Sequence, residues 1–198
     1  MTSLDVRLRA VMAENGARTT LFTVNTRFIH RFLIGLLRVL VNEEKKQGVY
    51  VCIDRPGAFV QATLRKCGID VSQIMFVDAV VKVASDLRAE RAPVQILSTP
   101  FCTEIVKQLT EVMEKINARL DAPPPDFLMV DNLGVLSCYC DDKTIERLME
   151  ALEVVGPRKS YFTIDPSTNE GLYRLARDRV QKSVELPADL FKLPAATA

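Results

Sequence analysis

The sequence predicts a three-layer α/β/α fold in which helices cover both faces of a mostly parallel central sheet. Short apolar runs rich in β-branched and aromatic residues alternate along the chain with longer segments of helical periodicity. Two of these runs, VYVCID (49–54) and FLMVD (127–131), are almost continuously apolar, as is typical of strands buried on both faces. The composition, 48% hydrophobic and 26% charged over 198 residues, is that of an ordinary globular protein.

The elements follow one another in a regular order. Residues 1–18 contain a short amphipathic helix whose apolar residues, Leu4, Leu8, Val11 and Met12, fall near one face. Parallel strands need crossover connections, and helices between the strands provide them. Strands are expected over 19–24, 49–54, 74–78, 94–98, 127–131, 160–164 and 183–186. Helices are expected over 27–47, 58–67, 100–120, 142–154 and 169–179.

Local signals mark the ends of elements rather than the boundary of a second domain. Thr99 and Pro100 form an N-cap and a first-turn proline, and the prolines of 123–125 separate a helix from the next strand. Residues 1–198 are therefore expected to form one domain with a tail over 187–198. The apolar residues of that tail are expected to pack on their own domain; the alternative is that they dock on a neighbouring molecule.

Charge, cysteine and glycine content exclude several classes of protein. The 26 basic and 25 acidic residues leave a net charge of +1, which argues against nucleic acid as the partner. The five cysteines contain no CxxC pair, which favours a reducing, cytoplasmic location. The most apolar stretch, 28–41, is too short to cross a membrane and carries three basic side chains. The eight glycines are scattered singly, whereas phosphate-binding loops need them clustered.

Four segments, read in order, resemble the core of the RecA superfamily. They are the first strand with the long apolar helix after it, GVYVCIDRPGAFVQATLRKCGIDVSQIMFVDAV, ILSTPFCTEI and PDFLMVDNLGVL. The likeness covers roughly residues 19 to 186 and is strongest to the KaiC-like proteins of archaea. This resemblance implies a central sheet with a nucleotide held at the carboxyl ends of its strands.

The sequence lacks the phosphate-binding loop that such a protein needs. A working member carries GxxxxGK[ST] between its first strand and first helix, where backbone amides surround the phosphates. Here that place holds Asn25, Thr26 and Arg27, with no glycine and no Lys-Ser/Thr pair. We expect an ordinary strand-to-helix turn in which Asn25 or Thr26 is the N-cap.

Three aspartates each end an apolar strand and should therefore meet at one edge of the sheet. By resemblance, Asp131 matches the Walker B carboxylate and Asp54 the position of a water-activating acid. Capping or structural hydrogen bonding is the simpler interpretation of Asp131, and an ion pair with Arg55 is that of Asp54. If Asp78 joins them, at least one of the three should be protonated, paired with Arg27 or Arg55, or bound to a cation.

Other polar residues have structural interpretations. His30, the single histidine, is expected to pack within its helix, and Glu104 to stabilise a helix start. Cys138 and Cys140 do not make a zinc set without distant partners, so the aspartates that follow are expected to cap a helix. The basic residues of 174–182 are expected to form a solvated face rather than a nucleic-acid site.

Together these observations favour a RecA/KaiC-like pseudo-ATPase that is not an enzyme, needs no cofactor or metal, and acts as a regulatory or scaffolding module. Its expected partner is a protein, either a second copy in a dimer or an active relative. The alternative is an atypical ATP-binding protein or weak ATPase that holds Mg-ATP around Arg27 and Asp131. In either case the expected vestigial nucleotide site comprises Asn25, Thr26, Arg27, Asp54, Arg55 and Asp131.

Overall fold

The computed structural model describes residues 3–79, 94–96, 105–118, 123–138 and 140–191. Within these residues seven strands form one parallel sheet, in the order β4-β3-β2-β5-β6-β1-β7. The strands are β1 (Thr19–Thr23), β2 (Gly48–Cys52), β3 (Ile74–Asp78), β4 (Val94–Ile96), β5 (Phe127–Val130), β6 (Lys159–Ile164) and β7 (Lys182–Glu185).

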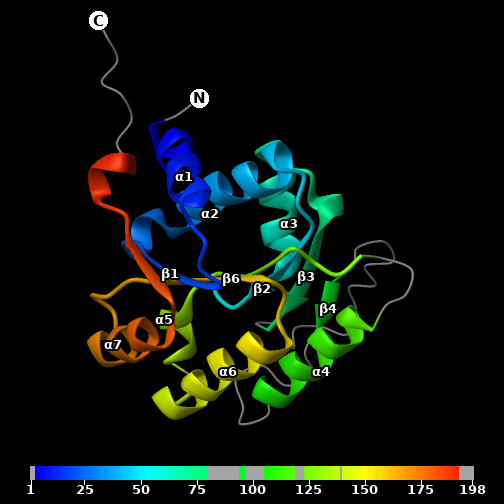
Figure 1. Cartoon of the computed structure of the whole chain (residues 1–198), viewed down its shortest axis with the longest axis vertical. Coiled ribbons are helices and arrows are strands. Elements are labelled where there is room, and N and C mark those ends of the chain that lie inside the picture. The colour runs from blue at the N-terminus through cyan, green and yellow to red at the C-terminus, as the bar shows by residue number, and fades with distance from the viewer. Residues whose placement is uncertain (1–2, 80–93, 97–104, 119–122, 139, 192–198) are drawn as a thin grey trace, which may run out of the picture.

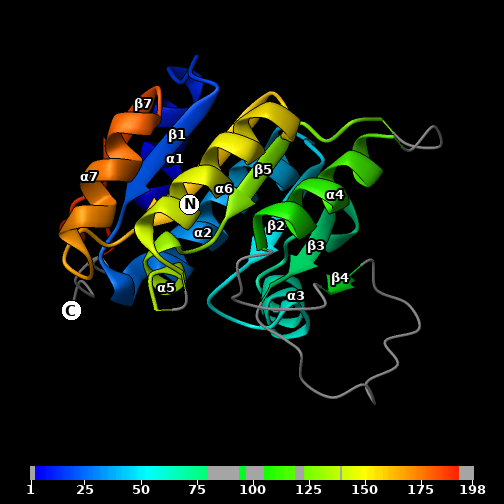
Figure 2. The same ribbon diagram turned by 90° about the horizontal axis from the view of Figure 1, so that it is seen from below.

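Helices cover both faces of the sheet, which confirms the predicted three-layer α/β/α class. Figure 1 shows α1 (Ser3–Ala13), α2 (Ile29–Leu37) and α3 (Gly57–Lys66) above the sheet. Below it lie α4 (Ile105–Asn117), α6 (Asp142–Val155) and α7 (Glu170–Arg179). Figure 2, seen from below, shows β7 and β4 at opposite sides of the molecule. The remaining short elements are η1 (Thr26–Phe28), η2 (Arg38–Glu43), η3 (Val71–Gln73), α5 (Leu133–Leu136) and η4 (Ala188–Phe191).

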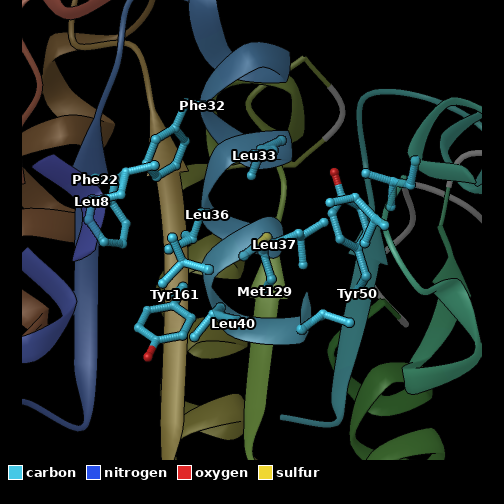
Figure 3. Packing of buried hydrophobic residues seen from close by; sticks show 14 of the residues in the cluster. Leu8, Phe22, Phe32, Leu33, Leu36, Leu37, Leu40, Tyr50, Met129 and Tyr161 are labelled. Atoms are coloured by element: carbon cyan, nitrogen blue, oxygen red, sulfur yellow. The ribbon is translucent and has the colours of Figure 1, made fainter. Parts of the chain in front are cut away.

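Alternation along each strand sends side chains to two separate cores. In β2, Val49 and Val51 belong to the core on the α4, α6 and α7 side. Tyr50 and Cys52 belong to the core on the α1, α2 and α3 side, because successive residues of a strand point to opposite faces. Figure 3 shows Tyr50 together with residues of α2 in that second core.

The α2 helix owes its position to an apolar stripe. Its buried residues include Ile29, Phe32, Leu33, Leu36 and Leu37, which follow the spacing of one helical face. Helix α1 crosses this segment at Gly35, where a Cβ atom would lie 3.0 Å from the Leu8 side chain and 3.3 Å from that of Leu4. The four residues predicted for the apolar face of α1 are all buried, as expected: Leu4, Leu8, Val11 and Met12.

The prediction of one helix over 27–47 is wrong in its winding and its end. After Leu37 the chain continues as the π-helix η2 to Glu43, and Lys45 then takes a φ of 56°. The buried residues of η2 are the consecutive Val39, Leu40 and Val41, a pattern that does not follow the α-helical period. Apolar residues therefore continue to face the core after the regular helix has ended.

The tail packs on its own domain up to residue 191, which confirms the simpler expectation for this part. Phe191 in η4 is buried and stacks on Phe28, with ring centroids 4.8 Å apart and planes 5° apart. The predicted Thr99-Pro100 helix start and Glu104 lie outside the described residues. Among the residues that are described, no helix combines the length and the apolar character needed to cross a membrane.

Candidate functional site at the carboxyl edge of the sheet

Because all the strands are parallel, the residues that follow them gather at one edge of the sheet. At the end of β1 the junction to α2 is the 3-10 turn η1, and Asn25 is its N-cap. The Asn25 side-chain oxygen accepts hydrogen bonds from the Arg27 backbone nitrogen at 3.3 Å and from its Nε at 3.1 Å. The guanidinium also lies 5.7 Å from the centre of the Phe28 ring. Arg27 is thus folded back onto its own turn, and Asn25 caps it as predicted.

Thr26 binds a carboxylate that the sequence analysis did not single out. Its backbone nitrogen and its hydroxyl donate to Asp165 Oδ2 at 2.6 and 2.8 Å. The other oxygen of Asp165 accepts from the nitrogen and the hydroxyl of Ser167 at 2.9 and 2.7 Å. Burial by itself would raise the pKa of Asp165, but these hydrogen bonds outweigh it and hold the pKa below its usual value. Asp165 directly follows β6, so the rule that selected Asp131 also applies to it.

Asp131 is enclosed by the backbone of the neighbouring strand end. Its side chain is buried, and Oδ1 accepts from the backbone nitrogens of Ile53 at 2.8 Å and Asp54 at 3.2 Å. Burial raises the pKa of this carboxyl from 3.8 to about 8, although the backbone hydrogen bonds act in the opposite direction. The group is therefore largely protonated at neutral pH, a form that suits structural hydrogen bonding better than binding a cation.

Asp54 pairs with His30 rather than with Arg55, so two expectations from the sequence are wrong. His30 Nε2 lies 3.3 Å from Asp54 Oδ2, and the His30 side chain is 39% exposed rather than packed. The hydrogen bond from His30 lowers the pKa of Asp54. Arg55 instead lies over the ring of Phe59, 5.1 Å from its centre. The way α2 packs across the sheet brings His30 to the end of β2. Helical periodicity alone could not predict this position, because it says nothing about which strand end a helix residue meets.

The third carboxylate on this edge is tied to the start of α3. Asp78 is buried, and one of its oxygens accepts a hydrogen bond from the Gly57 backbone nitrogen. Strands β3, β2 and β5 are neighbours, so Asp78, Asp54 and Asp131 follow adjacent strands as predicted. Of the outcomes foreseen for three crowded acids, the raised pKa of Asp131 matches protonation, whereas the expected pairing with Arg27 or Arg55 is replaced by the contact of Asp54 with His30.

These contacts test whether the edge fits a magnesium nucleotide. The amide and hydroxyl of Thr26 donate to Asp165, the Nε of Arg27 donates to Asn25, and the oxygens of Asp131 accept from backbone amides. The Thr26 amide and hydroxyl and the Asp131 carboxyl are therefore engaged by protein groups, an arrangement that does not fit that ligand. Across the described residues, no cluster of three or more His, Cys, Asp or Glu side chains is arranged to hold a metal ion.

Two other features of the sequence also have structural partners. Asp141 is the N-cap of α6 and accepts from the Thr144 nitrogen at 2.7 Å, as predicted for an aspartate after the two cysteines. On α7, Arg174 pairs with Glu170, and Arg179 pairs with Glu150 at 2.8 Å and with a second glutamate of α6. These glutamates neutralise part of the positive charge on this face of α7.

Comparison with known proteins identifies similar folds. No protein-family model and no curated protein matches the chain. An uncharacterised protein of the archaeon Pyrococcus horikoshii, crystallised in complex with an unknown peptide, is 12% identical; 93% of this chain aligns with 84% of that one at a TM-score of 0.66. A KaiC-like protein of the same hyperthermophile is 13% identical with a TM-score of 0.48, and 74% of this chain spans 60% of its length. At such identities the likeness concerns the fold alone.

Proposed function

We propose that this chain is a RecA-like pseudo-ATPase: a domain that keeps the sheet of a nucleotide-binding fold but neither binds nor hydrolyses ATP, and that works as a regulatory or scaffolding module. The state of Asp131 carries this proposal. Its carboxyl stands at the position that the resemblance assigns to Mg²⁺ binding, yet it is buried, hydrogen-bonded to backbone amides, and raised in pKa to about 8. A metal-binding carboxylate must be ionised and open to the ion.

The junction between β1 and α2 supports the same proposal. A phosphate-binding loop presents several backbone amides to its ligand. Here the Thr26 amide binds Asp165 and the Arg27 amide binds Asn25, so both donors are directed to protein acceptors. Asp165 also places a negative charge beside the position where phosphate would have to sit.

The partner class in this proposal is a protein. The similar Pyrococcus horikoshii protein was crystallised with a peptide, which is consistent with an interaction role for this fold. Three large apolar side chains remain exposed and could contact such a partner: Val6, Phe59 and Val154. A second copy of this chain or an active RecA-like relative would satisfy the proposal, and no nucleotide is required to bridge the subunits.

Thermal unfolding with and without Mg-ATP tests this proposal. A ligand present at a hundred times its dissociation constant stabilises a protein by about 2.7 kcal/mol. We expect no shift in Tm with millimolar Mg-ATP, none with Mg-ADP, and no release of phosphate. The Arg27→Gln variant supplies a matched comparison, since the alternative of an atypical ATP site predicts a shift in the parent that this variant loses. Turnover of ATP by the purified protein would refute the proposal.

A further inference from the structure

A cavity lies between α2 and α3, away from the junction discussed above. Its volume is about 120 Å³, and its walls include the apolar side chains of Leu33, Ile34, Val60 and Leu64. For comparison, a 150 Å³ apolar cavity in another protein holds benzene. The space therefore accommodates a branched or cyclic group of roughly five or six carbon atoms.

A buried hydroxyl group faces this cavity. Tyr50 lines it, and the residue is only 2% exposed. Within the described part of the chain the Tyr50 hydroxyl has no hydrogen-bond partner. Every fully buried side-chain oxygen or nitrogen of the described residues does have one, so the Tyr50 oxygen is not among the fully buried atoms. The hydroxyl oxygen is therefore not sealed in the core, and the cavity is the space it contacts. In Figure 3 it points toward the end of α2 that carries Phe32 and Leu33.

The polar part of the cavity lining includes a cation. Arg55 belongs to it, and its guanidinium is held over the half-exposed Phe59 ring at 5.1 Å. Among the described residues Arg55 has no ion pair, so its nitrogen donors are available. His30 also lines the cavity and binds the nearby carboxylate of Asp54, which is itself not part of the lining.

We propose that this cavity binds a small monocarboxylic acid with a branched or cyclic apolar body. The body lies against the α2 and α3 walls, the carboxylate accepts from the Arg55 guanidinium, and the Tyr50 hydroxyl donates a second hydrogen bond to it. A guanidinium presents donors in a plane that matches both carboxylate oxygens. This site is independent of the proposed function, because none of its contacts involves the Thr26 junction or Asp131.

Ligand-observed saturation-transfer NMR with titration tests the site in the whole protein. The probe is 4-methylpentanoate, and its neutral partner is 4-methylpentanamide. We expect millimolar or tighter binding of the acid and binding of the amide about tenfold weaker, since a hydrogen bond to a charged group is worth that factor or more. N-acetyl-L-leucine offers the same carboxylate on a peptide-like body. Tighter binding of this compound than of 4-methylpentanoate would overturn the assignment to a simple small acid and would point to the carboxyl terminus of a peptide.

Three variants separate the site from general effects on the fold. Arg55→Gln should weaken binding of the acid about tenfold, whereas Arg65→Gln, which removes the same charge from an exposed position of α3, should leave it unchanged. Tyr50→Phe should weaken binding several-fold without lowering Tm, because the hydroxyl has no protein partner to lose. Thr63→Leu should fill the cavity and abolish binding.

Three further results would overturn the proposal. Equal affinity for the acid and the amide would remove the carboxylate from the assignment. Binding that survives both Arg55→Gln and Thr63→Leu would place the ligand elsewhere. Absence of saturation transfer from 4-methylpentanoate at about ten times the millimolar concentration at which binding is expected would also refute it.

Discussion

Replacement of Asp131 by asparagine is expected to stabilise the protein relative to the parent by an amount that grows with pH. The parent carboxyl is 1% exposed, and burial raises its pKa from 3.8 to about 8. The unfolded chain ionises near 3.8, so the native state holds a proton that the unfolded state releases. Stability from this group is therefore complete below about pH 4 and is lost as the pH rises toward 8.

The size of the effect follows from the two pKa values. Each pH unit in this window lowers the free energy of unfolding by about 1.4 kcal/mol, so the parent gives up roughly 4 kcal/mol between pH 4 and pH 7. Asparagine does not titrate, and its oxygen can accept the hydrogen bond from the Ile53 nitrogen. Any cost of its two new amide donors is the same at every pH, so the pH slope is the quantity to compare.

Urea unfolding of both proteins at half-unit intervals from pH 4.5 to 7.5 measures this slope. Asp165→Asn, at the residue that directly follows β6, is the matched control, because the pKa of Asp165 is lowered rather than raised. Its stabilising contribution is present above the unfolded pKa and is lost as the pH falls through the folded pKa. That variant should thus be destabilised by a nearly constant amount from pH 4.5 to 7.5, with a curve parallel to that of the parent, and should approach the parent only at pH values below this range. Parallel stability curves for the parent and Asp131→Asn would refute the reasoning.

Three further substitutions test the packing and the edge of the sheet. Gly48→Ala should lower the free energy of unfolding by about 1–3 kcal/mol, since its Cβ would lie 2.2 Å from the Phe127 ring. Adding Phe127→Leu to the same chain should restore part of that free energy, measured by urea unfolding. Losses from the two substitutions that simply add would contradict this reasoning. Phe191→Ala should cost about 3 kcal/mol because that ring is buried and stacked, and an unchanged Tm would count against docking of the tail. His30→Gln should raise the pKa of Asp54 toward its usual value, measured by carboxyl ¹³C NMR, so that the variant is less stable at neutral pH and loses less stability in acid than the parent; an unmoved titration would exclude the contact with His30.

Much of the architecture could be predicted from local patterns. The strand expected over 74–78 coincides with β3, and the helix expected over 142–154 differs from α6 by a single residue at its end. Such patterns succeed because burial imposes a period of two on strands and 3.6 on helices. The winding of η2 was not predicted, since three consecutive buried residues carry no period that identifies a π-helix.

The candidate site was predictable only in part. A carboxylate after an apolar strand can be read directly, and the parallel sheet then places Asp54, Asp78 and Asp131 on one edge. The same rule would have found Asp165. The pairing of His30 with Asp54 and the open hydroxyl of Tyr50 could not be predicted, because each depends on how α2 and α3 lie across strands distant in sequence.

The amino-acid sequence alone determined the alternation of strands and helices, the parallel sheet that follows from it, and the short turn where a phosphate-binding loop would stand. The tertiary structure decided which acids remain charged and which group each one binds. The physical reason is that hydrophobic periodicity is a local property of the chain, whereas a pKa and an ion pair depend on burial and distance between segments that only the folded sheet brings together.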